Sequence, residues 1–356
     1  MEYHKIVDYS KLDPFKKIAL EKFSSSLGRP EKLGFRILKE TLGESAIAID
    51  FGGEFYIAFN VEGLGTKNII AEEMYKKTGN AKYFENIGID TVAMSTNDLS
   101  SIGAEPFVYG DIISSGSSDW FTEEKTRALL EGYKKAAEEL GIAIPCGETP
   151  TLQGIVYPET LDLAGAAVGA IRPKENLTVG QRLKEGDVIF GFESSGIHSN
   201  GVSLARKIAE GFPEGFFTEL PSGKIFGEEL LKPTRLYSGL VAGLLKKTEI
   251  HYFSPITGHG WKKIMRAKLP FSYEIDFVPE KGELFSFLQE KAKIPDFEAY
   301  YTWNMGLGYA AIAPKESSEE IFKQCKKFRL RAWELGRIKK GEKKVEIKPK
   351  KIVFLD

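Results

Sequence analysis

The chain contains almost no cysteine and carries almost no net charge. Cys146 and Cys325 are its only cysteines, which excludes a disulfide framework and a paired-cysteine zinc motif. The formal net charge is −1, so the total gives no electrostatic reason to bind nucleic acid or an anionic membrane. No apolar run approaches the roughly 20 residues that span a bilayer. The opening MEYHKIVDYSKLDPFKK lacks the apolar core of a signal peptide. We therefore expect a cytoplasmic protein without a membrane partner.

The composition is that of a globular protein. Hydrophobic residues make up 42% of the chain and charged residues 28%, a balance that supports a folded core rather than disorder. A chain of 356 residues can form two domains of ordinary size. The part from Lys323 onward is locally basic, KKFRLRAWELGRIKKGEKK. A solvated charged face explains it better than a nucleic-acid contact, so we expect no nucleic-acid partner.

Strand and helix patterns alternate along the chain. Residues 54–61 are rich in β-formers and residues 67–77 have a helical pattern. The clearest helix is FTEEKTRALLEGYKKAAEELG, which Thr122 can cap and Gly141 can end. The segments GIAIP and LDLAGAAVGAI then have the pattern of buried strands.

A polar stretch divides the chain near its middle. The segment RPKENLTVGQRLKEGD, punctuated by proline and glycine, follows the last of these strands. Such a segment is typical of a domain boundary. We therefore expect two domains, residues 1–170 and 171–356, each with mixed α and β structure.

Three glycine-bearing loops stand between a strand pattern and a helix pattern. The first, NVEGLGTK, places Glu62 ahead of its glycines and has threonine before lysine, the reverse of a Walker loop. The second is ESSGIHSNG, residues 193–201, and the third is PITGHG, residues 255–260. A glycine-rich loop at a helix N-terminus gathers free backbone N–H groups around an anion. One tight turn could look the same, but three such loops in one chain favour phosphate binding.

Polar side chains in these loops suit a phosphate or its counter-ion. They are Thr66, Lys67, Ser194, Ser195, His198, Ser199, Asn200, Thr257 and His259, with Gly63 and Gly65 in the first loop. Only four histidines occur, at positions 4, 198, 251 and 259. A lone histidine is more often structural than catalytic, and serine and asparagine in a loop could serve only to form turns.

Several longer segments resemble one known family. EGLGTKNIIAEEM is similar to its D-G-V-G-T-K stretch, and IGIDTVAMSTND to its G-x-D-x-V-A-M-x-x-N-D helix. CGETPTLQGIVYPETLDLAGAAVG, SSGIHSNGVSLARK, GEELLKPTRLY and WNMGLGY match further motifs in the same order. The chain thus resembles the aminoimidazole ribonucleotide synthetase family, whose activity is that of phosphoribosylformylglycinamidine cyclo-ligase. Selenophosphate synthetase, thiamine-phosphate kinase and formylglycinamide ribonucleotide amidotransferase belong to the same superfamily.

The resemblance implies a fold, a nucleotide and a metal. It implies a two-domain α/β (α+β) fold in which each domain has a mixed sheet with helices on one face, and a homodimer. It implies ATP bound with Mg²⁺ (or Mn²⁺ or Ca²⁺) and a small phosphorylated substrate. Its motifs place four metal ligands at Glu62, Asp98, Glu148 and Asp162, and hard cations prefer such carboxylate oxygens.

Further roles follow residue by residue from the matching motifs. Catalytic roles are expected for Lys67, Asp98 and His198. Nucleotide or substrate contacts are expected for Gly63, Gly65, Thr66, Lys67, Asn97, Asp111, Ser195, His198, Asn200, Thr257 and His259. Asn97 and Asp98 fall inside a helix pattern, where both residue types are somewhat unfavourable, which invites a functional explanation. Asp98 could instead be a surface carboxylate or cap, Glu148 a loop charge and Asp162 a strand-edge residue.

The chain departs from the family at four places. Glu62 stands where the family has aspartate, and Pro255 and His259 replace a histidine and a glycine of H-I-T-G-G-G. Residues 30–54 hold only scattered glycines where the family has a glycine-rich segment, and the opening motif D-I-D-A-G is barely visible in YSKLDPFKK. This pattern is typical of a divergent paralogue with the architecture kept.

Three functions remain open at this point. The first is the family reaction, in which ATP activates a formyl amide oxygen by phosphoryl transfer and an amine closes the imidazole ring. The second keeps the metal site but hydrolyses a phosphate ester or nucleotide with a metal-activated water. The third is a non-catalytic nucleotide-binding paralogue. Retained Asp98, Glu148 and Asp162 argue against the third, and ATP affinity would separate the first from the others.

Overall fold

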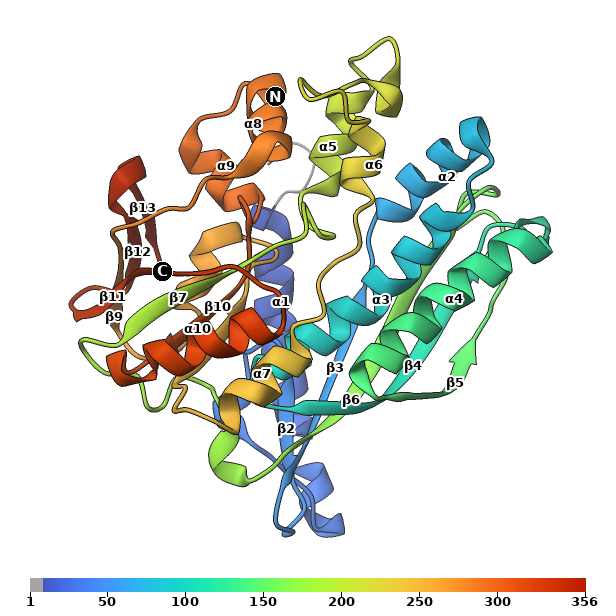
Figure 1. The fold of residues 1–356 in the computed structure, drawn as a ribbon. Helices are drawn as coiled ribbons and strands as arrows, with labels where there is room; N and C mark the ends of the chain where they lie inside the picture. The colour runs from blue at the N-terminus through green and yellow to red at the C-terminus, as the bar shows by residue number, and fades with distance from the viewer. Residues whose placement is uncertain (1–8) are drawn as a thin grey trace.

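A computed structural model describes residues 9–356 of the protein. His4 therefore lies outside the described residues. The chain forms two β-sheets with packed helices (Figure 1), which confirms the expected fold class. Among residues 9–356, no helix combines the length and the apolar character needed to cross a membrane.

The first sheet has six strands in the order β1-β2-β3-β6-β4-β5. Its strands are β1 (Arg36–Ile37), β2 (Ile47–Asp50), β3 (Tyr56–Gly63), β4 (Glu105–Ser115), β5 (Ala143–Glu148) and β6 (Leu161–Ile171). The accompanying helices are α1 (Tyr9–Phe23), α2 (Lys67–Thr78), α3 (Lys82–Ser100) and α4 (Glu123–Leu140). β6 runs antiparallel to both β3 and β4, and β5 runs parallel to β4.

Helices α3 and α4 lie together over one face of this sheet (Figure 1). Their backbones approach so closely that a Cβ at Gly132 would meet the Glu85 carbonyl oxygen at 2.0 Å. A Cβ at Gly88 would meet the Leu129 carbonyl oxygen at 2.5 Å, so both positions need glycine. The expected cap of α4 is present, because the Lys125 N–H donates to the Thr122 hydroxyl at 3.4 Å. Gly141 ends the helix in the left-handed region, with φ of 67°.

The second sheet has seven strands in the order β13-β12-β9-β11-β7-β10-β8. Its strands are β7 (Val188–Glu193), β8 (Tyr252–Pro255), β9 (Phe271–Ile275), β10 (Leu307–Ala313), β11 (Ala332–Lys340), β12 (Lys344–Ile347) and β13 (Ile352–Leu355). The helices are α5 (Val202–Ala209), α6 (Phe226–Leu230), α7 (Ser238–Leu245), α8 (Gly282–Ala292), α9 (Asp296–Thr302) and α10 (Ser318–Lys327). Residues 172–187 connect the two sheets.

This second sheet is buried on both faces. Val188, Phe190 and Phe192 pack under α7 and α10 in a small core of their own. Ile189, which points the other way, joins the main core of the molecule. The 3₁₀ segment η8 (Gly260–Met265) lies on that side with buried Trp261. The third glycine loop is thus followed by a short 3₁₀ turn rather than by the α-helix that the sequence predicts.

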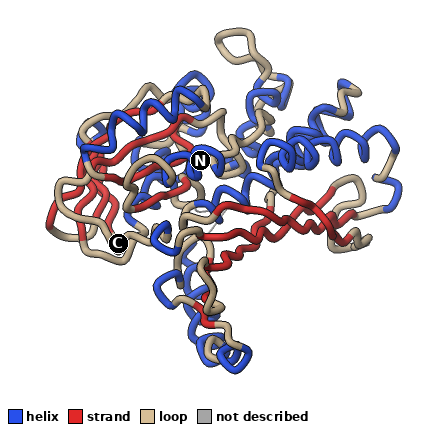
Figure 2. Tube along the Cα trace, turned by 60° about the horizontal axis from the view of Figure 1, so that its bottom comes forward, coloured by secondary structure: helices blue, strands red, loops and turns tan. Residues whose placement is uncertain are grey.

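The basic C-terminal part lies on the surface with acidic neighbours. Lys348 Nζ is 2.7 Å from Glu274 and 2.8 Å from Asp276. Lys350 Nζ is 3.4 Å from Asp296. These cations are neutralised within the fold, which fits a solvated charged face better than a nucleic-acid footprint. Figure 2 shows the two sheets side by side, with the N-terminal helical segment projecting from the body of the molecule.

Candidate active site

Carboxylates gather at one end of the first sheet. Glu62 lies near the end of β3, Glu148 ends β5, and Asp162 lies near the start of the antiparallel β6. Asp111 lies in β4. Gly165 of the central strand β6 is opposite Glu62 on one side and opposite Asp111 on the other. The strand directions therefore bring all four carboxylates to the same end of the sheet.

The sheet divides these carboxylates between its two faces. Directly opposed residues on paired strands share a face, so Glu62 and Asp111 lie on the face covered by α3. Glu148 is opposite Ile112, the neighbour of Asp111, and therefore lies on the other, open face. Asp162 is opposite Ser114 and lies on that open face too. The four predicted metal ligands do not meet in one cluster, because the alternation of side chains along a strand separates them into two pairs.

Glu62 and Asp98 form the carboxylate pair on the helix face. Asp98 is buried on α3, and its carboxylate lies near that of Glu62. Burial, reinforced by the negative charge of Asp98, raises the pKa of Glu62 to about 7. Asp98 Oδ1 and both amide atoms of buried Asn60, on the same face of β3 as Glu62, have no hydrogen-bond partner among the described residues.

These orphaned oxygens fit a hard cation. Buried polar atoms without partners are costly and rare, and they mark places where a ligand or ion completes the structure. Asn60, Glu62 and Asp98 together offer only oxygen and amide groups, the donors that Mg²⁺ takes. No group of three acidic, histidine or cysteine side chains in residues 9–356 is already arranged as a metal cage. Mg²⁺ typically takes one or two carboxylates and completes its shell with water and phosphate.

The segment that follows the third glycine loop brings positive charge near this pair. Lys263 Nζ donates to the Thr257 hydroxyl. Burial lowers the pKa of Lys263, and the charges of Asp98 and Glu62 oppose that shift. The positive charge of Arg266 also lowers the pKa of Glu62, so Arg266 too is near the carboxylate pair. Acidic side chains of the first sheet and α3 therefore stand near basic side chains of the second half of the chain, an arrangement suited to a metal–phosphate complex.

His259 has an unusual backbone for a non-glycine residue. Its φ is +67°, in the left-handed region where the family motif has glycine. Its Nδ1 lies 2.6 Å from the Tyr301 hydroxyl. Burial lowers the pKa of His259 to about 4, so the ring is neutral at pH 7. It belongs to the third loop itself.

Lys67 is turned away from the carboxylate pair. Its side chain is completely buried, with Nζ 2.8 Å from Asp90 Oδ2 and donating at 2.8 Å to the Lys232 carbonyl oxygen. Burial lowers its pKa, which the Asp90 charge opposes. In this arrangement the ammonium group holds the two domains together and does not reach a phosphate at the loop. Thr66, beside it, approaches the Ser203 hydroxyl at 3.3 Å and so joins the first loop to α5, the helix that follows the second loop.

Asn97 is likewise occupied by the protein itself. Its Nδ2 donates to the Arg235 carbonyl oxygen at 2.7 Å, and its Oδ1 accepts the Tyr237 N–H at 2.8 Å. One turn later, the Ser100 and Ser238 hydroxyls are 2.7 Å apart. Side chains of α3 thus bind the backbone of the segment GEELLKPTRLY along its length. Each amide atom of Asn97 thus already has one partner in the second half of the chain.

His198 stabilises the second loop through a hydrogen bond within the loop. His198 is buried with φ of +60°, and its Nε2 accepts the Ser195 N–H at 3.3 Å. Burial lowers its pKa to about 3, so it is neutral and a poor partner for phosphate charge. The Ser195 hydroxyl donates to the Pro233 carbonyl oxygen at 2.6 Å. Asn200 Nδ2 has no partner among the described residues, which leaves it for a ligand.

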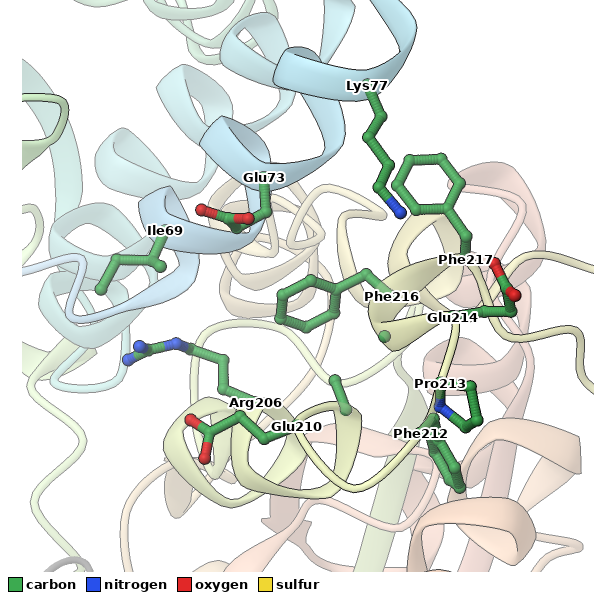
Figure 3. Close-up of a pocket in the computed structure, with 12 residues that line it drawn as sticks. Ile69, Glu73, Lys77, Arg206, Glu210, Phe212, Pro213, Glu214, Phe216 and Phe217 are labelled. Carbon is green, nitrogen blue, oxygen red and sulfur yellow. The ribbon is translucent and has the colours of Figure 1, made fainter.

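A cavity of about 380 Å³ lies between α2 and the segment formed by α5 and the loop that follows it. Figure 3 shows α2 on one wall and α5 with the following loop on the other. Phe216 and Arg206 project into it, and Lys77 Nζ lies 4.8 Å from the centre of the Phe217 ring. Its size is that of a small-molecule site.

The sequence analysis did not predict the residues that line this cavity, nor Asn60, Lys263 and Asp90. The one signal available for these residues in the sequence was a polar residue within an apolar strand or helix pattern.

Both halves of the chain match family models. Residues 43–171 match the N-terminal domain and residues 184–348 the C-terminal domain of AIR synthase related proteins. Over 294 residues the chain is 36% identical to phosphoribosylformylglycinamidine cyclo-ligase of Methanocaldococcus jannaschii, covering 82% of this chain and 80% of that one.

Solved structures show the same fold at low sequence identity. AaThiL complexed with AMPPCP and TMP aligns with a TM-score of 0.61 at 16% identity, over 99% of this chain and 96% of that one. Hydrogenase maturation protein HypE in complex with ATP aligns with a TM-score of 0.58 at 15% identity, over 83% and 82% of the two chains. Two architectures that hold a nucleotide or its analogue therefore share this arrangement of sheets.

Proposed function

Because the chain belongs to the AIR synthase related protein family, we propose that it is an ATP- and Mg²⁺-dependent enzyme of the cyclo-ligase type. The reaction transfers the terminal phosphoryl group of ATP to the amide oxygen of a phosphorylated formyl-amidine substrate. The substrate's amine then attacks the activated carbon, the ring closes, and phosphate leaves beside the ADP already formed. The observation that carries the proposal is the pairing of Glu62 with buried Asp98, with orphaned Asn60 on the same face and Lys263 nearby.

The protein's part is to position groups and to neutralise charge. Asn60, Glu62 and Asp98 would hold the divalent cation, which supplies positive charge to the phosphates of the nucleotide. Lys263 and Arg266 approach from the second domain and can contact the phosphoryl group in transfer. No side chain among these is needed as a covalent nucleophile.

We place the phosphorylated substrate in a second binding site, next to α5 and on the other side of the first loop. Asn200 offers an unpaired amide at the N-terminus of α5, and Arg206 projects from the same helix into the cavity of Figure 3. A guanidinium there suits a phosphate or carboxylate of the substrate.

A homodimer completes the proposal. Phe59, Val61 and Ile112 lie on the open face of the first sheet and are 38%, 60% and 45% exposed. An apolar sheet face of this kind is stabilised when another sheet packs on it. Light scattering should give twice the chain mass of 39.7 kDa, and Val61→Asp should shift the protein toward monomer. A clean monomer at micromolar concentration contradicts this part of the proposal.

Release of ADP and of phosphate, measured separately over a substrate panel, tests the function. Equal amounts of ADP and phosphate, formed only with formylglycinamidine ribonucleotide present, support the cyclo-ligase reaction, and Asp98→Asn is the inactive control. Phosphate released from esters without ATP would favour the metal-dependent hydrolase. ATP binding with neither product released would favour a nucleotide-binding paralogue.

A further inference from the structure

The segment that leads into β2, residues 39–45, is bound by side chains of the second half of the chain. Lys268 Nζ donates to the carbonyl oxygen of Lys39 at 3.2 Å and to that of Glu40 at 3.1 Å. Lys268 lies within the match to the C-terminal family domain, whereas the match to the N-terminal family domain begins at residue 43. The segment is therefore held across the boundary between the two domains.

Two further contacts fix the end of this segment. The hydroxyl of buried Tyr252, on β8, donates to Glu44 Oε2 at 3.0 Å. Arg266 Nη1, just after η8, donates to Ser45 Oγ at 2.5 Å. Glu44 and Ser45 are adjacent, so the Tyr252 contact anchors the backbone from which the Ser45 hydroxyl meets the guanidinium.

Arg266 stands near carboxylates of two different places in the fold. Burial raises the pKa of Glu44, and the positive charge of Arg266 opposes that shift together with the hydrogen bond from Tyr252. The same guanidinium charge lowers the pKa of Glu62 in the candidate active site. Arg266 thus connects residues 44 and 45 to the carboxylate pair of the site.

Another cavity, of about 310 Å³, opens beside Arg266. Lys263 and His259, which belong to the third loop and the turn after it, line it together with Arg266. An ammonium and a guanidinium group on one cavity are the two side-chain cations that proteins use to bind phosphate. The cavity is therefore suited to the phosphates of a nucleotide.

Two carboxylates also line this cavity, and each already has a basic neighbour. Asp356 Oδ1 is 3.1 Å from Lys343 Nζ. Asp13 Oδ1 is 3.4 Å from Lys16 Nζ. Their negative charge is thus largely neutralised within the protein, and it does not cancel the charge of Arg266.

An arginine side chain needs support to act at a defined place. It is long and flexible, and it loses rotamer freedom when it binds a ligand. A hydrogen bond that orders the side chain before binding removes part of that cost. A guanidinium has several N–H donors, and the Ser45 hydroxyl takes one of them, which leaves others for a phosphate.

We infer that Ser45 is a positioning residue, which holds the Arg266 guanidinium at the cavity beside Lys263 so that it binds the phosphates of the nucleotide. Glu44, anchored by Tyr252, keeps Ser45 in place. The inference rests on the proposed function for the identity of the ligand. It adds a residue of the first domain that acts only through an arginine of the second.

Binding of inorganic tripolyphosphate with Mg²⁺ to the full chain, measured by calorimetry, tests the inference without any catalysis. Ser45→Ala should raise the dissociation constant about tenfold, the factor that corresponds to one hydrogen bond to a charged group. Ser45→Thr keeps the hydroxyl and should bind nearly as the wild type does. Lys268→Met removes two contacts of the same segment without touching Arg266, and it should leave the constant unchanged.

A second measurement ties the effect to Arg266. In an Arg266→Met background, Ser45→Ala should change tripolyphosphate binding by less than twofold, because residues that act through one group are not additive. The inference is overturned by an unchanged constant in Ser45→Ala, by an equal loss in Lys268→Met, or by a tenfold effect that persists without Arg266. Absence of tripolyphosphate binding to the wild type overturns it too.

These outcomes are separate from the fate of the proposed reaction. If the wild type binds tripolyphosphate in a manner that depends on Ser45, yet releases no ADP with any substrate, the cyclo-ligase proposal fails and the positioning role stands. If ADP and phosphate are formed and Ser45→Ala binds tripolyphosphate normally, the reaction stands and the positioning role fails.

Discussion

Lys67 and Asp90 form an ion pair with both side chains completely buried and 2.8 Å between Nζ and Oδ2. Asp90 Oδ1 accepts the Thr234 N–H at 2.7 Å, and Lys67 Nζ donates to the Lys232 carbonyl oxygen. The pair therefore fixes the first glycine loop against a backbone segment of the second domain. A lysine that the loop motif places at a phosphate serves here as an interdomain connection.

Removing one member of this pair should destabilise the protein strongly. Lys67→Met leaves the Asp90 carboxylate buried without its counter-ion, which typically costs about 3–5 kcal/mol. The double variant Lys67→Met, Asp90→Asn should lose less than the sum of the two single changes, because no charge is left unpaired. Urea unfolding measures each free energy. If Lys67→Met kept full stability and lost only turnover, the lysine would be catalytic as the motif predicts.

Asp98→Asn should weaken metal binding. Divalent ions that bind the folded protein raise its stability by mass action, by about 2.7 kcal/mol at a hundredfold excess over Kd. We expect Mg²⁺ to raise the melting temperature of the wild type and to do so much less in Asp98→Asn. Asp162→Asn, on the open face, is the matched control and should keep most of the response. Calorimetry without heat of binding at millimolar Mg²⁺, Mn²⁺ or Ca²⁺ would exclude the metal site.

The carboxylate pair should also give a pH dependence of stability in metal-free buffer. The folded-state pKa of Glu62 is about 7, above its unfolded value of about 4.3. Between these values the folded state binds more protons than the unfolded state, so stability falls as pH rises from about 4.3 to 7 and then levels. Glu62→Gln should remove this component. Chemical unfolding at each pH in EDTA measures it, and a wild-type profile identical to that of Glu62→Gln would contradict the shift.

His198→Ala should lower stability more than it lowers substrate affinity. The substitution leaves the Ser195 N–H without its acceptor, at about 1–3 kcal/mol, and puts alanine at φ of +60°. Asparagine tolerates that backbone, so His198→Asn should lose less. Thermal unfolding and KM for the phosphorylated substrate are measured together. A raised KM at unchanged stability would restore the substrate contact that the family motif implies.

Lys263→Met should raise KM for ATP by at least tenfold. It removes a cation whose charge acts on Glu62 and Asp98, whereas the charge of adjacent Lys262 does not act on the pKa of Glu62. Lys262→Met is therefore the control and should bind ATP normally. Equal loss in both variants would mean that only the general positive charge of this loop matters.

The sequence by itself determined the architecture and most local structure. Strand alternation, the Thr122 cap and the Gly141 end of α4 are local features, and each is present in the fold. The helix containing Asn97 and Asp98 followed from its pattern as well. Short-range periodicity and capping chemistry depend on neighbours within a few residues, which the sequence displays directly. The family followed from the order of the matching motifs, because each motif is a short run of residues that the sequence displays directly.

Only the tertiary structure decided which polar residues are free to act. Lys67 and Asn97 lie in motifs that imply ligand contacts. Lys67 instead pairs with Asp90, more than twenty residues away along the chain. Asn97 hydrogen-bonds to the backbone of Arg235 and Tyr237, more than a hundred residues away. The division of the carboxylates is a matter of register, since one residue along a strand moves a side chain to the opposite face. Burial, which makes His198 neutral and raises the pKa of Glu62, depends on the packing of both domains. None of these is a property of a local window, because each depends on which distant segment the fold brings against the residue.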